Sequence, residues 1–512
     1  MKVLFVSAEV APFSSVGGLS QVSYFLPRAL IKQGADVRIF TPKYGIINNQ
    51  QFPTRSVIKE LKVPTGENKN SLHPQKLICN VNTLIKTKRG DPKVYLLENM
   101  EYYEKRANVY NYSDDHIRFG LLSRGALEFI KKKEFVPDLI HCNDWHTAYL
   151  IDFLKNAYKN DPILKKIASL LSIHNLYQGI FDFEHASEMD FDDGKSRLAP
   201  FFTERFYKQN ALKRGLIHAD LVNTVSETYA HEILTEEYAG RLHNLFKELR
   251  GKISGVLNGL DYNNFNPRTD KIIKKDYGLT SLKQRAENKT DLQKEFDLQV
   301  SPETPILAFS GRLHAQKGLE LIMDTIEFIL SEFEVQFIAL GTGEDKYLNF
   351  LQKLENKHPQ KVGTHLMKNF TLPRKIFAGA DMILIPSQYE PGGIVALEAM
   401  RYGCIPIVRE TGGLADSVKD FNLAEGKGTG FTFKKFFKMS FLTAVIRALE
   451  TYKNQKIWKK IVRQAMQEDF SWEHTASEYL ELYRKATEIR KETQEDNSPF
   501  RLEKRVADHV LG

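Results

Sequence analysis

The sequence predicts an α/β protein of two Rossmann-like, doubly wound domains that face a cleft between them. Short apolar runs alternate with stretches in which apolar residues recur at helical spacing, which is the pattern of repeated βαβ units. The pattern starts at the N-terminus and starts again after the turn-rich segment 258–267. The chain has 512 residues, enough for two large halves, and a cleft between halves is a common place for a ligand site.

The first half opens on a βαβ unit. Residues 2–7 are rich in Val, Leu and Phe and predict a buried strand, which a glycine-containing turn follows. Apolar residues then recur at helical spacing over 22–30, and Pro27 should kink this helix or lie near its first turns. Residues 37–40 predict a second strand, joined to the first by a right-handed parallel crossover. Three more strands are predicted at 138–141, 169–173 and 221–225.

The second half repeats the pattern. A charged, helix-prone stretch leads to about residue 298, after which short apolar runs and helical segments alternate again. The same argument therefore predicts a second α/β domain. Its predicted strands are 306–310, 336–340, 382–386 and 405–408.

Composition narrows the class of protein. The net charge of +8 is small and spread along the chain, which argues against a nucleic acid partner. The three cysteines, Cys79, Cys142 and Cys404, lack CxxC spacing, so we expect neither a disulfide framework nor a structural zinc. Glu9 interrupts the first apolar run, which indicates a strand rather than a signal peptide. No apolar stretch approaches the roughly 20 residues that span a bilayer, and we expect a reducing, cytoplasmic location.

Two glycine pairs lie where a strand passes into a helix. Gly17-Gly18 follows the first strand, and Thr411-Gly412-Gly413 follows the strand at 405–408. Glycines at such a turn let backbone N–H groups approach a phosphate at the positive end of a helix. The full GxGxxG fingerprint is absent, so a plain tight turn explains each pair about as well.

Arg312 and Lys317 occupy the loop after the strand at 306–310. Two cations near a helix N-terminus are poorly placed for the helix dipole, so an anion between them is the favoured explanation. The alternative is that both side chains are merely solvated. We expect a phosphate site here.

Glu390 lies in the turn 389–393, which also follows a strand, and Glu398 lies eight residues further on. A carboxylate on such a turn points over the edge of the sheet where open α/β sheets bind ligands, and it could accept hydrogen bonds from sugar hydroxyls. Glu398 could equally be an exposed helix residue.

Four residues invite a metal hypothesis: His141, Asp144, His146 and His174. The chain supplies no H-x-x-x-H or similar pair, so hydrogen-bonding roles are favoured over metal binding. Asp190-Phe191-Asp192 formally matches the Asp-x-Asp that holds a metal in some sugar-transferring enzymes, but its Gly- and Asp-rich surroundings favour a solvated turn.

Together these motifs resemble those of the bacterial glycogen synthases and plant starch synthases, retaining glycosyltransferases of the two-Rossmann GT-B fold. The resemblance runs from Met1 to about Lys485. Each motif is weak alone, but in this order the set is highly specific. The matching segments are 15–19 (SVGGL), 141–146 (HCNDWH), 173–179 (IHNLYQG), 224–226 (TVS), 257–261 (LNGLD), Arg312 with 316–318 (QKG), 390–393 (EPGG), 411–416 (TGGLAD) and 470–472 (FSW).

The resemblance implies two groups of site residues and no metal or other cofactor. In the expected catalytic group, Arg312 and Lys317 are the cations that bind the nucleotide phosphates. Glu390 is the carboxylate that contacts the donor glucose, and Asp144 and His174 lie beside the sugar. The expected substrate-binding group comprises Ser15, Gly17, Gly18, Gln21, His146, Asn175, Asn258, Glu398, Thr411, Gly412 and Gly413.

The implied reaction moves α-glucose from a nucleoside diphosphate glucose, ADP-glucose first, to the non-reducing 4-hydroxyl of an α-1,4-glucan with retention. Its physical content is leaving-group stabilisation, because charge grows on the diphosphate as the glycosidic bond breaks. The alternatives are glucosyl transfer with another acceptor or donor, a nucleotide-sugar epimerase of the same fold, and a catalytically silent glucan-binding relative.

Departures from the family pattern concentrate near the expected donor site. The family usually has Lys two residues before the first Gly pair and Asp three residues after it, where this chain has Ser15 and Gln21. A Cys commonly follows Glu-Pro, and here the residue is Gly392. An aromatic residue that stacks near the base is replaced around Met367 and Lys368. We therefore expect a rebuilt donor pocket with weaker or shifted preference among nucleotides.

The resemblance also sets the expected domains. Residues 1–265 would form the acceptor-side domain and 266–470 the nucleotide-sugar domain. The segment 470–472 resembles the place where the last helix crosses back, so 471–490 would be that helix and 491–512 a charged tail. Closure of the two domains is expected to assemble the site.

Overall fold

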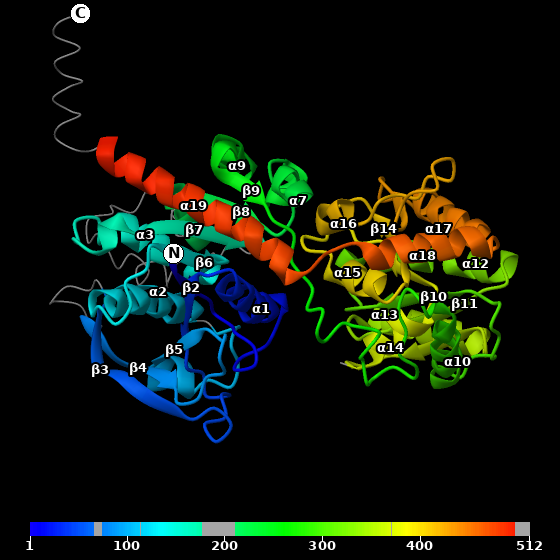
Figure 1. The fold of residues 1–512 in the computed structure, drawn as a ribbon, viewed down its shortest axis with the longest axis horizontal. Coiled ribbons are helices and arrows are strands. Elements are labelled where there is room, and N and C mark those ends of the chain that lie inside the picture. Colours follow the sequence, from blue (N-terminus) through cyan, green and yellow to red (C-terminus); the bar gives the residue numbers. More distant parts are fainter. Residues whose placement is uncertain (66–73, 113, 177–209, 370, 497–512) are drawn as a thin grey trace, which may run out of the picture. The chain divides into compact units, whose positions relative to one another are not determined.

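The computed structural model describes residues 1–65, 74–112, 114–176, 210–369 and 371–496. Contacts divide the chain into two compact units (Figure 1). Unit 1 takes its described residues from 1–225, 233–256 and 472–496, and unit 2 takes its residues from 226–232 and 257–471. Each unit is therefore assembled from segments that are far apart in the sequence.

The described part of unit 1 contains a nine-stranded sheet in the order β3-β4-β5-β2-β1-β6-β7-β8-β9. The run β5-β2-β1-β6-β7-β8 is parallel and follows the 3-2-1-4-5-6 order of a Rossmann fold. The strands are β1 (Lys2–Val6), β2 (Asp36–Pro42), β3 (Thr54–Pro64), β4 (Lys76–Leu84), β5 (Lys93–Glu98), β6 (Leu139–Asn143), β7 (Ala168–Ile173), β8 (Leu221–Thr224) and β9 (Ile253–Gly255).

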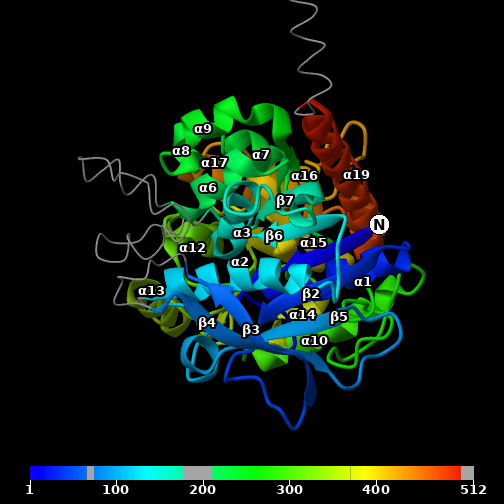
Figure 2. The ribbon, with the colours of Figure 1, turned by 90° about the vertical axis from the view of Figure 1, so that its left-hand side faces the viewer.

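Helices cover both faces of this sheet. Helices α1 and α19 pack together, and α2, α3 and α6 form a second layer (Figures 1 and 2). Because β6 and β7 are covered on both sides, every residue in them is buried, which explains their continuous apolar runs. Pro27 lies well inside α1. The helices are α1 (Gly18–Lys32), α2 (Asp115–Lys131), α3 (Trp145–Lys155), α6 (Ala211–His218), α8 (Glu236–Ala239), α9 (His243–Glu248) and α19 (Trp472–Asp496), with short turns η1 (Met100–Glu104), η2 (Leu164–Lys166) and η3 (Arg250–Lys252).

Unit 2 repeats the Rossmann arrangement. Its described strands form a six-stranded parallel sheet in the order β12-β11-β10-β13-β14-β15, again 3-2-1-4-5-6. The strands are β10 (Ile306–Ser310), β11 (Gln336–Leu340), β12 (Val362–His365), β13 (Met382–Ile385), β14 (Ile405–Arg409) and β15 (Phe431–Phe433). The helices are α7 (Glu227–Glu232), α10 (Arg285–Glu295), α11 (Leu319–Met323), α12 (Ile326–Glu332), α13 (Asp345–Lys357), α14 (Leu372–Gly379), α15 (Ile394–Arg401), α16 (Gly412–Ser417), α17 (Lys438–Tyr452) and α18 (Gln455–Gln467), with turns η4 (Leu282–Gln284) and η5 (Ala315–Lys317).

The predicted fold class of two Rossmann-like sheets is confirmed. Each of the predicted apolar runs coincides with a parallel strand to within two residues. Strand β5, the antiparallel pair β3–β4 and the short strands β9, β12 and β15 were not predicted. Figure 2 shows β3 beside α2. No described helix is long and apolar enough to cross a membrane.

Helix α19 is held on the sheet of unit 1 by buried hydrogen bonds. The Tyr483 hydroxyl lies 2.8 Å from His141 Nδ1, and the Asn223 side-chain amide donates to the Tyr479 hydroxyl at 3.2 Å. His141 therefore belongs to a structural network. The helix continues to Asp496, beyond the expected boundary at 490.

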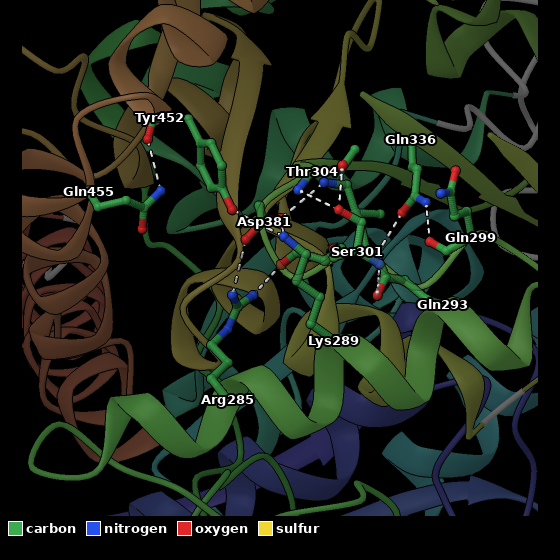
Figure 3. Close-up of polar contacts among 12 residues, drawn as sticks. Arg285, Lys289, Gln293, Gln299, Ser301, Thr304, Gln336, Asp381, Tyr452 and Gln455 are labelled. Carbon is green, nitrogen blue, oxygen red and sulfur yellow. Dashed lines mark hydrogen bonds and ion pairs between the residues drawn. The ribbon is translucent and has the colours of Figure 1, made fainter. Parts of the chain in front are cut away.

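Figure 3 shows a polar cluster at the amino-terminal ends of the unit 2 strands. Arg285 and Lys289 project from one side of α10 toward Asp381, the residue before β13. Lys289 Nζ lies 2.8 Å from one Asp381 carboxylate oxygen and Arg285 lies 3.7 Å from the other, while the Ile306 amide donates to this carboxylate at 3.0 Å. Open α/β sheets bind ligands at the opposite edge, so this cluster fastens α10 to the sheet.

Candidate active site

Two loops of unit 2 begin at its topological switch point. β10 and β13 are neighbours where the strand order reverses, and both lead from their carboxyl ends into predicted site motifs. Arg312 and Lys317 follow β10, and Glu390 follows β13. Ligands of open α/β sheets bind at this edge, so topology alone brings the three residues to one region.

Lys317 and Glu390 form an ion pair at the centre of this region. Lys317 Nζ lies 2.6 Å from Glu390 Oε2, and the Ser387 hydroxyl donates to the same oxygen at 2.9 Å. The side chains of Lys317 and Glu390 are only 18% and 15% exposed, so water screens the pair weakly. Glu390 Oε1 has no hydrogen bond within the described part of the chain.

A glycine sets the position of Lys317. The turn η5 ends at Gly318, whose φ of +71° is left-handed. A Cβ at Gly318 would lie 1.9 Å from the Pro386 carbonyl oxygen. Only glycine therefore lets the Lys317 loop close on the loop that carries Ser387 and Glu390.

Arg312 stands apart from the ion pair. Its side chain is exposed, and its guanidinium makes one hydrogen bond to a described residue, at 3.3 Å to Gln316 Oε1. Gln316 also donates from Nε2 to the Tyr389 carbonyl oxygen at 3.1 Å, so one side-chain amide links the two loops. The sequence analysis included Gln316 in the 316–318 motif but gave it no role, although its place between the two cations was a usable signal.

A small pocket of about 40 Å³ opens beside the ion pair. At roughly 10 to 15 Å³ for one water, this volume suits a group of about phosphate size. Gly393 and Val395, at the start of α15, line the pocket together with Ser387. The N–H groups and positive dipole end of α15 therefore face the same space as Lys317, an arrangement that favours an anion. Sequence reasoning placed the carboxylate of this turn but missed Ser387 and the helix start.

The Thr411-Gly412-Gly413 turn has its hydrogen-bond donors engaged. Glu232 of α7 accepts from the Thr411 hydroxyl at 2.8 Å and from the Gly412 amide at 3.2 Å. The Gly413 amide donates to the Glu390 carbonyl oxygen at 3.0 Å, and a Cβ on Gly412 would lie 2.3 Å from that oxygen. The two glycines therefore let this turn support the Glu390 turn by direct backbone contact.

Helices α7 and α16 cap each other. Asp416 of α16 accepts from the Ser226 hydroxyl at 2.6 Å and from the Thr228 amide at 3.2 Å, at the start of α7. Glu232, at the end of α7, binds the start of α16 in return. Each carboxylate thus meets the positive end of the other helix.

Glu398 lies on α15 and is half-buried, so it is not simply an exposed helix residue. Burial raises its pKa to about 8, and the positive charge of Arg374 opposes that rise. Within the described chain the Glu398 carboxylate makes no hydrogen bond and no ion pair. A ligand hydroxyl could therefore be its partner.

In unit 1 the switch point lies between β1 and β6, and Asp144 follows β6 directly. Asp144 has a φ of +56° and stands at the N-cap of α3. Its Oδ1 accepts from the His174 amide at 2.7 Å and from the Asn175 amide at 3.3 Å, so three predicted residues meet here. Burial raises the pKa of Asp144 to about 7, against the effect of these amides.

His174 and His146 are buried beside Asp144. His174 Nε2 lies 2.9 Å from Asn143 Oδ1, and burial lowers the pKa of His174 to about 4. The His146 ring packs 4.7 Å from the ring of Tyr110, and burial lowers its pKa to about 3. The Nδ1 atoms of both rings lack a hydrogen-bond partner within the described residues. Each neutral ring thus keeps one buried nitrogen without a partner among the described residues.

The Gly17-Gly18 turn carries an internal carboxylate that sequence reasoning missed. Glu9 Oε2 accepts from the Val16 amide at 2.6 Å and from the Gly17 amide at 3.1 Å. Burial raises the pKa of Glu9, and these amides oppose the rise. A Cβ on Gly18 would meet nothing within 4 Å, so this turn faces open space, unlike the turn at 411–413. An acid in the loop after the first strand was the available signal.

The remaining predicted site residues have fewer contacts with other described residues. Ser15 and Gln21 are exposed, and the Ser15 hydroxyl contacts Ser20 Oγ at 2.8 Å. Asn258 is buried, and its Oδ1 has no partner among the described residues. Asn175 is exposed apart from its amide contact.

The described residues contain no group of three or more His, Cys, Asp or Glu side chains that could hold a metal ion. The Asp190-Phe191-Asp192 motif, the end of the 173–179 motif and the tail from 497 lie outside the described residues.

Comparison with known proteins identifies the family. The family described as starch synthase catalytic domain matches residues 2–248, and glycosyl transferases group 1 matches residues 291–465. The glycogen synthase of Thermotoga maritima is 40% identical over 493 residues, covering 95% of this chain and 99% of that protein. The glycogen synthase of Clostridium beijerinckii is 38% identical over 502 residues, with coverage of 95% and 99%.

Solved structures agree. The catalytic domain of starch synthase IV from Arabidopsis thaliana, bound to ADP and acarbose, has a TM-score of 0.81 and 30% identity, covering 95% of this chain and 99% of that chain. Sucrose-phosphate synthase from Thermosynechococcus elongatus has a TM-score of 0.56 at 18% identity and shares the fold, covering 94% of this chain and 98% of that one. With these matches along nearly its whole length, the chain belongs to the glycogen synthase family of GT-B glycosyltransferases.

Proposed function

We propose that this protein transfers glucose from a nucleoside diphosphate glucose to the non-reducing end of an α-1,4-glucan, with retention of the anomeric configuration. Family membership supports the reaction, and the ADP and acarbose bound to the Arabidopsis relative support a nucleotide donor and a glucan acceptor. The three cysteines are buried free thiols, which supports action in a reducing cytoplasm.

The observation that carries the proposal is the Lys317–Glu390 pair beside the phosphate-sized pocket at the start of α15. Lys317 has three N–H donors, of which Glu390 and the leaving diphosphate can each take one. As the glycosidic bond breaks, negative charge grows on the diphosphate. Lys317 and the α15 N–H groups are already in place to stabilise that charge, so the barrier falls without reorganisation.

Arg312 is proposed to supply a second cation from the edge of this pocket. Its guanidinium is exposed and held by a single hydrogen bond to Gln316, so it can turn toward a bound diphosphate. The Thr411–Gly413 turn is proposed to act indirectly, because its donors already bind Glu232 and the Glu390 carbonyl group.

Glu390 is proposed to hold the donor glucose. Its Oε2 is anchored by Lys317 and Ser387, which leaves Oε1 to accept a hydrogen bond from a sugar hydroxyl. Hydrogen bonds to a charged acceptor are roughly twice as strong as neutral ones, so this contact can orient the sugar firmly.

In unit 1, Asp144, His174 and Asn175 are proposed to contact the sugar. The unpartnered Nδ1 of His174 offers a neutral hydrogen-bonding group, because burial keeps the pKa of this ring far below neutrality. Asp144 holds the backbone of both neighbours, and so orients them.

Incubation with glucose-labelled nucleotide donors and glycogen tests the proposal. We expect label in the polymer that an α-1,4-specific amylase releases, and loss of that label in Lys317→Met. Label in an altered free sugar would indicate an epimerase, and binding of glucan without transfer would indicate a silent relative. Either result would overturn the proposed reaction.

A further inference from the structure

A second pocket in unit 2 has no assigned ligand. Its volume is about 200 Å³, and the ends of α15 and α18 contribute to its walls. Arg268 and Arg401 line it together with the apolar residues Pro267, Leu279 and Met466. It shares no lining residue with the pocket beside Lys317.

A backbone carbonyl and a ring hold the Arg401 side chain, whereas the exposed Arg268 packs against a glycine. Arg401 ends α15, donates from Nε to the Phe265 carbonyl oxygen at 3.3 Å, and places its guanidinium 4.1 Å from the centre of the Tyr262 ring. Arg268 lies against Gly278, where a Cβ would come within 2.6 Å of its Nε. Glycine at 278 therefore makes room for this guanidinium. Within the described chain, neither arginine forms an ion pair with Asp or Glu.

Two of the acidic residues next to the lining segments are engaged elsewhere, and the exposed Asp276, two residues before Gly278, forms no ion pair with either arginine. Asp270 accepts from the Tyr402 hydroxyl and lies 3.6 Å from Arg374. Glu468 pairs with Lys419 at 2.9 Å. The two arginines consequently face the pocket with their charge uncompensated by a described carboxylate.

We propose that this pocket binds a small phosphate-bearing molecule. Planar guanidinium groups match phosphate oxygens in paired hydrogen bonds, and two of them line one cavity. The volume lies below the roughly 300 to 1,000 Å³ of sites for larger ligands, which favours a phosphate with a short carbon chain. Pro267, Leu279 and Met466 offer that chain an apolar wall.

The pocket is also connected to the first one. Gly393 and Val395, at the start of α15, line the first pocket together with Lys317, and the helix ends at Arg401. Its eight residues span about 12 Å. A ligand on Arg401 would thus hold the same helix whose other end faces the first pocket.

Calorimetric titration of the full chain with orthophosphate, and separately with glycerol 3-phosphate, tests the proposal. We expect Arg268→Gln and Arg401→Gln each to weaken binding about tenfold. Arg463→Gln is the matched control, since Arg463 lies exposed on α18 and does not line the pocket. This variant should bind the probes like the wild type, and Lys317→Met should retain the binding event that the two arginine variants weaken. Tighter binding of glycerol 3-phosphate than of orthophosphate would show that the apolar wall contributes, and equal binding would assign the phosphate alone as ligand.

Binding that Lys317→Met abolishes while both arginine variants retain it would overturn the proposal, because the probes would then occupy the first pocket. Absence of binding to the wild type at about 10 mM, corresponding to less than roughly 3 kcal/mol, would also overturn it. If a Gln variant unfolds, Arg401→Lys keeps the charge and should bind with intermediate affinity. The titration needs no nucleotide and no glucan, so its failure is separate from a failure of the proposed transferase activity.

Discussion

Replacement of Lys317 by methionine should remove most of the catalytic rate while leaving the fold intact. Methionine keeps the length and apolar stem of the side chain but loses the ammonium group that lies 2.6 Å from Glu390. Loss of one preorganised donor at a developing anion typically costs about 10² to 10³ in kcat, or roughly 3 to 4 kcal/mol. The pair is largely shielded from water, so we expect the upper part of this range.

The same pair makes a second substitution informative. Lys317 and Glu390 are in contact, so the effects of Lys317→Met and Glu390→Gln should not add, and a coupling of about 0.5 to 3 kcal/mol is expected. The double variant should therefore lose less activity than the product of the two single losses. The sign of this coupling follows from charge. Lys317→Met alone leaves the negative Glu390 carboxylate beside the diphosphate, whereas the double variant removes that charge as well.

The assay is initial-rate glucosyl transfer to glycogen at saturating donor, with urea unfolding of each variant in parallel. Lys346→Met is the matched control, since Lys346 pairs with Glu320 at an exposed site, and it should retain nearly full activity. If stably folded Lys317→Met kept more than about a tenth of the wild-type kcat, the assigned leaving-group role would be wrong.

Three further outcomes are expected. Glu390→Gln should lower transfer far more than affinity for the bare nucleoside diphosphate, and an equal loss of both in equilibrium binding would place Glu390 at the ribose or in the scaffold. Burial raises the pKa of Asp144 from its ordinary 3.8 to about 7, so the folded protein holds this proton more tightly, and the stability it provides is lost as the pH rises from about 4 through 7. The unfolding free energy of the wild type should therefore fall between pH 5 and pH 8, and Asp144→Asn should not show this fall. Urea unfolding at both pH values measures the difference, and parallel pH profiles of wild type and variant would contradict the assignment. In competition assays at least one donor besides ADP-glucose should be used within about tenfold in kcat/KM of the best, the size of one stacking contact, and a thousandfold preference for ADP-glucose would refute a rebuilt pocket.

The sequence predicted strand positions best where both faces of a strand are buried. Strands such as β6 and β7 are apolar throughout, so their position could be read directly, and Rossmann topology then placed Lys317 and Glu390 at one sheet edge. Strands β3 and β4 were missed because only part of each is buried and a bulged register breaks the alternation of polar and apolar residues.

The site was predictable as a set of residues but not as a set of contacts. Glu232 and Glu9 each satisfy a glycine turn, and neither was identified. Glu232 acts on a turn 180 residues away, which no local pattern reveals, whereas Glu9 lies eight residues from Gly17 and left a local signal that was not used. The two Gly-Gly-Leu turns read alike in sequence. The difference arises only from what approaches them, which is the backbone of Glu390 at Gly412 and nothing at Gly18.

The mutual capping of α7 and α16 and the anchoring of α19 have a consequence for synthesis on the ribosome. Helix α7 emerges early, yet its capping partner Asp416 is made almost two hundred residues later. The nascent first unit must likewise wait for Tyr479 and Tyr483 before the buried side chains of Asn223 and His141 find their partners. Domains usually fold as they leave the ribosome, but here the first unit cannot be completed until α19 has been translated, and a chain that stops before α19 would lack the two tyrosine hydroxyls that bind Asn223 and His141.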